Sequence, residues 1–569
     1  MKFTKGRIVV ILLAALLLSA TACAKRAAPE NQGADMASGG GNDDMMRPFA
    51  PYPDTVTVST ARQLNLGNPL AEGVTTSDNI YIDVIKDKLN VHVVIDWETT
   101  PDDYSRRLDL AIASDTLPDV FLLQSDQYLT FKWLVENGKL ADLTEAYGKC
   151  VGGYDDLYLS FMDGSQNKPC LFDGKLMGIP QIPTGYNYNL LWVRQDWLNK
   201  LGLSAPRTLD DIKSIALAFQ SHRMGGSSTK GIIVDPETVL GDSGNFLSLS
   251  TVANALGAYP ATWIYGPDGS AMYGSIAPEM KDTLSVLRDW YESGVLDPQF
   301  MTYPDMNAVT PAMRDGQCGL FFGAYWSPWI VSYSAADPDK QWTPVFGPVD
   351  KNGVFNHTNS NSPAGYLVVS AKCGHPEAVI KAVNVAYELQ RGAYNDDPAI
   401  KAEVDRLTAA GCFGRTINPF PGALSGMFDE EARRGISYMD YCQTGTLEPI
   451  PGLPLEAIQD TADKCLAWFK GDKVVRTDSD LDNRVQYESY KTIADLYNDP
   501  NQHDEPVAFS GTTESMGSYW PALSAMEKQA FIDIITGVKP VGYFDEFVSK
   551  WLETGGSTVT AEVNEIINN

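Results

Sequence analysis

Hydrophobic and polar residues alternate with two different periods in the chain that follows residue 54. Short runs rich in Val and Ile with a period of two are separated by stretches whose apolar positions have helical spacing. The predicted elements, in chain order, are a strand at 55–60, a helix at about 79–89, a strand at 91–97, a helix at 104–114 and an apolar strand at 120–123. This order is typical of a parallel sheet in an α/β fold, whose ligands gather at the carboxyl ends of the strands. Those ends carry Arg62 and Gln63 after the first strand, and Gln124, Ser125 and Asp126 after the third.

The stretch from residue 174 to residue 203 combines a turn, a strand and a helix. Pro180 predicts the turn, because proline fixes φ and has no N–H to donate to a ladder. Residues 186–193 alternate aromatic, amide and aliphatic side chains and predict a buried strand. Asp196 is expected to cap the following helix, whose apolar side includes Trp197. We therefore expect Trp197 to be a core residue.

The second half of the chain continues the α/β pattern and then becomes mainly helical. Its predicted elements are helices at 209–220 and 278–292, strands at 319–323 and 366–370, and helices at 376–389, 480–497, 523–536, 543–554 and 560–567. The strand at 319–323 ends in Ala324-Tyr325-Trp326-Ser327-Pro328-Trp329. Three aromatic residues after a strand end, beside glycine and proline, are more typical of the rim of a pocket than of a core.

Length and charge narrow the class of protein. A chain of 569 residues exceeds what one hydrophobic core usually supports, so two lobes are expected. The 44% of apolar residues excludes a wholly disordered chain. The formal net charge of −28 argues against nucleic acid as a partner, because phosphates require a basic patch, and it disfavours adhesion of the folded surface to anionic lipid.

The N-terminus has the pattern of an export signal. Lys2, Lys5 and Arg7 form a basic segment, and the apolar run at 8–18 is too short to span a membrane comfortably. Small residues then precede Cys23, which is similar to a bacterial lipoprotein cleavage site, although an ordinary secretory signal has the same outline.

We interpret residues 1–22 as a lipoprotein signal peptide and Cys23 as the lipid-bearing N-terminus of the mature chain. Residues 23–53 are rich in Gly, Ala, Asn, Asp and Ser and predict a flexible tether. Since no later stretch is apolar enough to span a membrane, the body of the protein is expected outside the cell, anchored to the cell membrane.

The remaining seven cysteines cannot all pair, and one or two disulfides are compatible with an extracellular location. They show no zinc spacing, so we expect no metal site, and no phosphate loop or dinucleotide motif predicts a cofactor. Asp478, Asp480 and Asp482 have the spacing that opens a calcium loop. Position twelve is Ser489 instead of Glu, so a solvated acidic run is the preferred interpretation.

Five segments resemble family 1 extracellular solute-binding proteins of bacterial ABC importers. They are LPDVFLL at 117–123, LWVRQDWLNKLGL at 191–203, YGSIAPEMKDTLSVLRDWYESGVLDPQF at 273–300, PAGYLVVS at 363–370 and IITGVKPVGYFDEFVSKWLETGGSTVTAEVNE at 534–565. The resemblance implies a two-lobe, periplasmic-binding-protein-like α/β fold of type II, with hinge crossings and a ligand cleft between the lobes. The implied N-terminal lobe comprises residues 54–188 and about 363–450, and the C-terminal lobe comprises residues 189–362 and about 451–569.

The resemblance also implies that the protein captures a solute, most simply an oligosaccharide, and delivers it to an ABC transporter permease. It further implies a monomer without enzymatic activity. A sugar site needs flat aromatic platforms for C–H faces, together with groups that hydrogen-bond hydroxyls. The candidate ligand-binding residues at strand ends or hinge crossings are Asp126, Tyr186, Asn187, Trp263, Tyr325, Trp326, Trp329 and Trp520. Trp520 is expected in a loop before a C-terminal helix, and Tyr186 and Asn187 at the first crossing.

Two other classes of function remain open at this point. The first is a secreted polysaccharide hydrolase or lyase, because a pair of carboxylates across a cleft is possible in so acidic a chain. The second is a receptor for a peptide or another solute on the same scaffold. Turnover of glycans would distinguish the first, and a ligand screen by thermal shift would distinguish the second.

Overall fold

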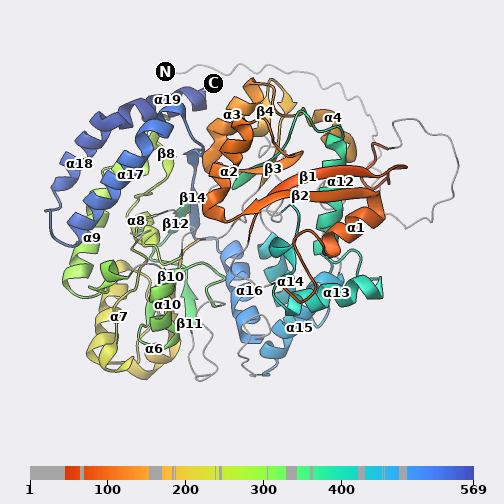
Figure 1. Ribbon diagram of the computed structural model, residues 1–569. Coiled ribbons are helices and arrows are strands. Elements are labelled where there is room, and N and C mark those ends of the chain that lie inside the picture. The colour runs from red at the N-terminus through yellow and green to blue at the C-terminus, as the bar shows by residue number, and fades with distance from the viewer. Residues whose placement is uncertain are drawn as a thin grey trace, which may run out of the picture. The chain divides into compact units, whose positions relative to one another are not determined.

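The computed structural model describes residues 45–64, 70–152, 169–181, 185, 188–236, 239–241, 246–303, 306–328, 342–358, 363–420, 430–450, 453, 455–472 and 483–568 (Figure 1). They belong to one compact unit, Asp44–Asn569. Cys23 and the interpreted signal peptide lie outside the described residues.

A five-stranded mixed sheet organises the first part of this unit. Its strands, in spatial order, are β2 (Val91–Thr99), β1 (Val56–Gln63), β3 (Val120–Gln124), β13 (Gly365–Val369) and β6 (Ile179–Gln181). Strand β1 runs parallel to β2 and β3, whereas β13 runs antiparallel to both β3 and β6. The strand and helix pattern predicted for 55–123 is confirmed.

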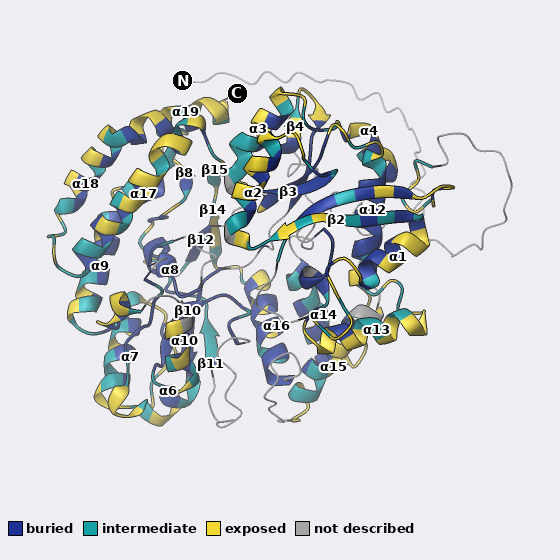
Figure 2. Cartoon of the chain, in the orientation of Figure 1, coloured by how far each residue is buried: buried dark blue, intermediate teal, exposed yellow. Residues whose placement is uncertain are grey.

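Helices cover this sheet and bury their apolar sides against it. Helix α1 (Ile80–Leu89) begins where the side chain of Asn79 accepts a hydrogen bond from the N–H of Tyr81, at 3.0 Å. It packs beside α12 (Pro376–Gln390), whose central residues are nearly all buried. Figure 2 shows β3 and much of β1 in dark blue, β2 with teal and yellow parts, and the outward sides of the helices in yellow. We call the buried cluster around this sheet the first core.

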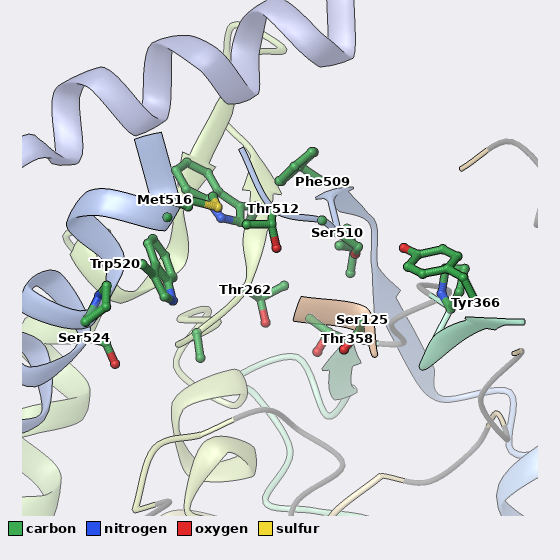
Figure 3. A pocket seen from close by; sticks show the side chains of 17 residues that line it. Ser125, Thr262, Thr358, Tyr366, Phe509, Ser510, Thr512, Met516, Trp520 and Ser524 are labelled. Carbon is green, nitrogen blue, oxygen red and sulfur yellow. The ribbon is translucent and has the colours of Figure 1, made fainter. Parts of the chain in front are cut away.

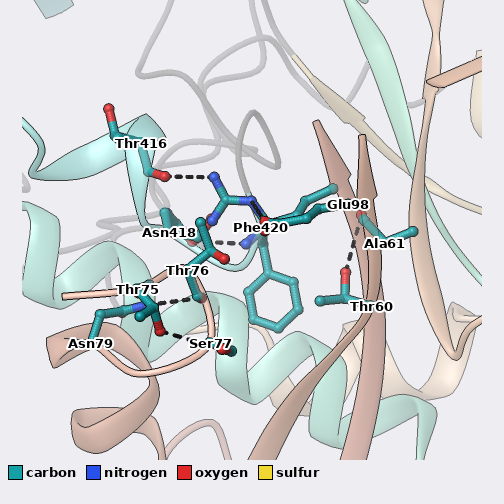
Figure 4. A network of polar contacts seen from close by, with 11 residues as sticks. Thr60, Ala61, Thr75, Thr76, Ser77, Asn79, Glu98, Thr416, Asn418 and Phe420 are labelled. Atoms are coloured by element: carbon teal, nitrogen blue, oxygen red, sulfur yellow. Dashed lines mark hydrogen bonds and ion pairs between the residues drawn. The ribbon is translucent and has the colours of Figure 1, made fainter. Parts of the chain in front are cut away.

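A buried arginine at the end of β1 ties a distant loop to the sheet. Arg62 is 1% exposed, and its guanidinium donates to the carbonyls of Thr416 at 2.6 Å and Asn418 at 3.3 Å. The Glu98 carboxylate lies 3.9 Å from its Nε (Figure 4). Arg62 thus has a structural role at this strand end, where the sequence also allowed a ligand contact.

A second group of elements surrounds a three-stranded antiparallel sheet, in the order β10 (Leu320–Gly323), β7 (Leu190–Arg194) and β11 (Trp342–Val345). Leu191 and Val193 belong to the buried cluster that we call the second core, and Trp192 belongs to a smaller cluster with Phe321. The indole N–H of Trp192 donates to the carbonyl of Gly323 at 2.9 Å. The predicted buried strand is therefore confirmed from Leu190 onward.

The helices of the second core include α6 (Gln195–Leu201), α7 (Leu209–Ser221) and α9 (Met280–Glu292). The prediction that Asp196 caps α6 is wrong, because the N-cap is Arg194 and Asp196 lies in the first turn. There its carboxylate accepts two hydrogen bonds from the Arg194 guanidinium, at 2.7 and 2.6 Å. This bidentate pairing draws the acid away from the free backbone N–H groups.

The C-terminal helices belong to two different clusters. Helices α14 (Glu430–Thr444), α15 (Leu455–Phe469) and α16 (Asn483–Asn498) contact one another and contribute Tyr438, Cys465 and Ile493 to the first core. Helices α17 (Glu514–Ile535), α18 (Tyr543–Trp551) and α19 (Ser557–Asn568) belong to the second core. The predicted lobe boundary near residue 450 puts α15 and α16 with the second core, whereas their packing groups them with the first.

The described residues show neither disulfide bonds, nor clustered metal ligands, nor a membrane-spanning helix. All seven cysteines among the described residues are free thiols. No group of three or more His, Cys, Asp or Glu in the described part of the chain has the arrangement of a metal site. Of the described helices, none combines the length and the apolar character that crossing a membrane requires. Asp478, Asp480 and Asp482 lie outside the described residues.

We expect replacement of Trp197 by Ala to lower the free energy of unfolding by about 3–5 kcal/mol, because it removes a fully buried side chain. Trp197 is 2% exposed, its ring meets Phe219 edge-on at 5.1 Å, and the Arg194 guanidinium lies over it at 4.7 Å. Urea denaturation of the two proteins measures the difference. Trp133→Ala is the control, because Trp133 is 45% exposed and its loss should change stability little. Equal effects of the two substitutions would contradict the prediction.

Candidate ligand-binding site

A cavity of about 620 Å³ lies between the edge of the five-stranded sheet and elements of the second core. This volume is within the range of small-molecule sites. Its lining residues are Ser125, Ala261, Thr262, Trp263, Thr358, Pro363, Tyr366, Val507, Phe509, Ser510, Gly511, Thr512, Met516, Gly517, Trp520, Pro521 and Ser524 (Figure 3).

The sheet presents its ligand-binding edge to the cavity. Ser125 follows the carboxyl end of β3, Tyr366 lies at the amino end of β13, and Pro363 lies two residues before that strand begins. Because β13 runs antiparallel to β3, with Gly365 opposite Gln124, these two ends meet at one edge. The edge is the one at which parallel α/β sheets place ligands.

The opposite wall consists of two strands and a helix from distant parts of the sequence. Strand β8 (Trp263–Tyr265) pairs with β9 (Ala271–Tyr273) and with β15 (Val507–Phe509). Helix α17 begins at a capping box, in which the Thr513 hydroxyl accepts from the N–H of Met516 at 3.3 Å. The first two turns of α17 then line the cavity through Met516, Gly517 and Trp520.

Two tryptophans contribute to this wall: Trp520 is half-buried, and Trp263 is 5% exposed and belongs to the second core. The rings of Trp263 and Trp520 are stacked, with centroids 6.4 Å apart and planes inclined by 29°. Behind them, Tyr273 meets Trp520 edge-on at 5.2 Å and stacks on Trp551 at 5.3 Å. Trp551 is fully buried in the second core, so the tryptophan pair rests on a rigid support.

A buried carboxyl group fixes the residues behind the tryptophan pair. Glu527 of α17 accepts hydrogen bonds from the Tyr273 hydroxyl at 3.0 Å and from the Ser275 hydroxyl at 2.6 Å. Burial raises the pKa of Glu527 to about 7, and the two hydrogen bonds oppose this change only in part. Glu527 lines a smaller cavity of about 270 Å³ that shares Trp520 and Ser524 with the main one.

The polar groups of the main cavity are mostly hydroxyls. They belong to Ser125, Thr262, Thr358, Tyr366, Ser510, Thr512 and Ser524. Burial raises the pKa of the Tyr366 phenol above its ordinary value, so this group is a neutral donor at physiological pH. Figure 3 shows the hydroxyls of Thr262, Ser125 and Thr358 gathered between Trp520 on one side and Tyr366 on the other.

Helix α17 also offers a backbone acceptor to the cavity. Pro521 lies inside the helix and has no N–H to donate to the carbonyl of Gly517, four residues earlier. Both residues line the cavity. The carbonyl of Gly517 therefore lacks the N–H donor that an α-helix normally supplies four residues later.

Two of the eight candidate residues, Trp263 and Trp520, line the cavity together. The expectation that Trp520 occupies a loop is wrong, because α17 begins at Glu514 and continues through Pro521. The capping box at Thr513 starts the helix nine residues before the predicted start at 523. Sequence reasoning thus found the side chain but placed it on the wrong kind of element.

Tyr325 and Trp326 do not line this cavity. Tyr325 is 5% exposed and belongs to the first core, where burial raises the pKa of its phenol. Trp326 is half-buried and its ring packs against Phe246 at a centroid distance of 5.6 Å. Their predicted role as ligand contacts stays a prediction.

The other candidates cannot be placed as side chains. Asp126 belongs to the short helix Ser125–Gln127 that follows the lining residue Ser125, but its side chain lies outside the described part of the structure. Tyr186, Asn187 and Trp329 also lie outside the described residues.

Sequence reasoning missed the segment 507–512 and the hydroxyls of Thr262 and Thr358. A Ser- and Thr-bearing strand end carries no periodic signal, and β15 has only three residues. The available signal was the apolar run Val507–Phe509, followed by Ser510, Gly511 and two threonines just before a helix start.

The chain belongs to the bacterial extracellular solute-binding protein family, whose model matches residues 73–388, more than half of the sequence. The resemblance of the sequence to solute-binding proteins is thereby confirmed.

Two curated relatives are named for their ligands. The polygalacturonan/rhamnogalacturonan-binding protein YtcQ of Bacillus subtilis strain 168 is 22% identical over 488 residues, which cover 84% of this chain and 85% of YtcQ. The fructooligosaccharide ABC transporter substrate-binding protein FusA of Streptococcus pneumoniae serotype 4 is 22% identical over 258 residues, 43% of this chain. That match covers less than half of FusA, namely 46% of its length.

Solved structures share the fold. A FusA EF-hand mutant from S. pneumoniae in complex with fructo-nystose superposes with a TM-score of 0.61 at 15% identity, covering 90% of this chain and 99% of FusA. The alginate-binding protein AlgQ2 without calcium ion gives a TM-score of 0.58 at 14% identity, covering 92% and 100% of the two chains. The predicted α/β fold of periplasmic-binding type is confirmed by these likenesses.

We expect the protein to lose stability as the pH rises from about 4.5 to about 7, because Glu527 stays protonated longer in the folded state than in the unfolded chain. Its pKa is about 7 when folded against an ordinary value of 4.5, so its contribution is complete below pH 4.5 and is lost through pH 7. The loss amounts to about 3 kcal/mol.

Urea unfolding at a series of pH values, compared between the natural protein and Glu527→Gln, isolates this contribution, because Gln does not titrate. Glu514→Gln is the matched control, since Glu514 is exposed on the same helix. Identical pH slopes for the natural protein and Glu527→Gln would show that Glu527 does not titrate in this range.

Proposed function

We propose that this protein is an extracellular receptor that captures an oligosaccharide in the cavity beside Trp263 and Trp520 and delivers it to the permease of an ABC transporter. The observation that carries the proposal is a stacked pair of tryptophans, with ring centroids 6.4 Å apart, that lines one cavity together with a group of hydroxyls. The names of FusA and YtcQ, which refer to fructooligosaccharides and to polygalacturonan and rhamnogalacturonan, support a carbohydrate ligand.

The chemistry of a saccharide matches both the tryptophan pair and the hydroxyls of the cavity. A pyranose or furanose ring has apolar C–H faces, which an indole covers with little loss of conformational entropy. Its rim of hydroxyls both donates and accepts hydrogen bonds, as do Ser, Thr and Tyr hydroxyls. The carbonyl of Gly517, which has no N–H donor four residues later, is a further acceptor in the lining. A few such contacts supply the roughly 8 kcal/mol that a micromolar ligand needs.

Closure of the two cores around the ligand is part of the proposal. The chain leaves the first sheet at β6 and enters the second core at β7, so one crossing lies between Gln181 and Leu190. A second crossing lies between β12 (Phe355–Thr358) and β13. Because the cavity has walls from both cores, rotation at these crossings narrows or widens it. We place the lobe boundary after α16, near residue 499, on the packing described above.

The lining supports a receptor in preference to a polysaccharide hydrolase. Glycoside hydrolysis uses two carboxyl groups that flank the scissile bond. The cavity wall, as far as the structure describes it, contains neither Asp nor Glu. Peptide capture has less support, because the same wall offers no charged side chain for peptide termini.

We expect Trp520→Ala to weaken oligosaccharide binding by about 10- to 100-fold through loss of the stacking surface. Trp520 is half-buried, so the fold should tolerate the change. The ligand is first identified by a thermal-shift screen of neutral and acidic glycans, and calorimetry then gives its affinity for each variant.

Trp326→Ala is the matched variant, since Trp326 is a half-buried tryptophan outside the cavity lining. A loss of affinity in Trp326→Ala alone would move the site to the aromatic segment 324–329 and contradict the role of Trp520. Normal unfolding midpoints of both variants are required for the comparison.

Anchoring through a lipid on Cys23 completes the proposal. The basic segment, the apolar run and the small residues before Cys23 are the sequence features that support it. A single Cys23→Ser substitution should therefore move the protein from the detergent phase to the aqueous phase on Triton X-114 partition of expressing cells. Cys373→Ser, which changes a half-buried cysteine of the folded unit, should leave the partition unchanged. Retention of Cys23→Ser in the detergent phase would contradict the anchor.

A further inference from the structure

The described lining of the main cavity contains no charged side chain. Its seventeen residues are hydroxyl-bearing, aromatic, apolar, Gly or Pro residues. Lys528, the nearest cation along α17 after Ser524, lines the smaller cavity and not the main one. An anionic ligand group in the main cavity would therefore meet hydroxyls and aromatic faces but no Lys or Arg among the described residues.

Three carboxylates lie near the part of the cavity wall formed by β8 and β15. Tyr259 lies two residues before the lining residue Ala261, and Glu505 lies two residues before Val507. Burial raises the pKa of the Tyr259 phenol, and the carboxylates of Glu505, Asp350 and Asp504 raise it further. These three carboxylates therefore lie close enough to Tyr259 to place negative charge near β8 and β15.

The chain as a whole adds to this negative field, because its formal net charge is −28. Such a field repels anions and lowers their concentration at a cleft. A carboxylate removed from water without a cationic partner also loses its hydration.

We infer that the ligand is a neutral oligosaccharide, without uronic acid or sulfate groups in the part that occupies the cavity. This inference rests on the proposed function, because it specifies the chemistry of the same site. It also separates this chain from relatives named for acidic polymers, such as YtcQ, which is named for binding polygalacturonan and rhamnogalacturonan.

The test uses pairs of glycans that differ in charge and share a backbone. Oligogalacturonates are compared with the same oligomers after full methyl esterification, and xylo-oligosaccharides with their glucuronic-acid-substituted forms. Neutral gluco-, manno-, galacto- and fructo-oligosaccharides and acidic alginate oligomers extend the panel. Calorimetry on the mature full-length chain measures each affinity at low and physiological salt, because salt screens long-range repulsion.

The inference expects at least one neutral oligosaccharide to bind, and its charged counterpart to bind about 100-fold more weakly or not at all. Equal or tighter binding of the charged member would overturn the inference and leave the proposed function intact. If no glycan in either group binds, the proposed function fails, and the inference fails with it.

A gain-of-function variant tests the reason for the selectivity. Ser510 is an exposed lining residue at the end of β15, so Ser510→Lys adds a cation to the wall without disturbing a core. In this variant, the ratio of the affinity for the neutral glycan to the affinity for its charged counterpart should fall about tenfold or more. Ser510→Gln is the matched control for length without charge. If Ser510→Lys and Ser510→Gln change this affinity ratio equally, charge is not the cause of the selectivity.

Discussion

The return of β13 to the first sheet is the constraint on which the rest of the structure depends. This strand inserts between β3 and β6 and runs antiparallel to both, which joins residues near 122, 180 and 367 in one sheet. The consequence is that the chain must leave the sheet and come back, and the elements of the second core occupy the intervening sequence. The same pairing sets the amino end of β13 beside the carboxyl end of β3, so Tyr366 and Ser125 meet at one edge.

The opposite wall obtains its rigidity from the second core. Trp263 and Trp520 rest on Tyr273 and Trp551, and the hydroxyl of Tyr273 is held by Glu527. Four aromatic rings and one carboxyl group thus connect the cavity surface to fully buried residues. Such support preorganises a flat surface, which lowers the entropic cost of binding. A near-neutral pKa for Glu527 is the electrostatic cost of using a carboxyl group in this position.

Local patterns in the sequence were enough for much of the fold. Strands at 55–60, 91–97 and 120–123 and the helices between them follow from hydrophobic periodicity, and the family resemblance supplied the two-lobe class. The packing of α15 and α16 did not follow, because an amphipathic helix reveals its buried side but not its partner. The burial of Glu527 could have been predicted from the sequence, because Glu527 lies four residues after Leu523 and four before Phe531, on the apolar side of α17. The hydroxyls of the site had no such signal, since Ser and Thr at strand ends are common in any loop.

The seven free thiols have a consequence for how the protein must reach its folded state. Burial raises the pKa of Cys442 to about 11 and that of Cys318 to about 12, so these sulfurs remain protonated and chemically inert once packed. In the unfolded chain the same groups have ordinary acidity and are accessible to oxidants. For a member of an extracellular family, mispairing of such deeply buried thiols is therefore a hazard of the unfolded chain. Burial in the cores, and not a cross-link among the described cysteines, separates these sulfurs from oxidants in the folded protein.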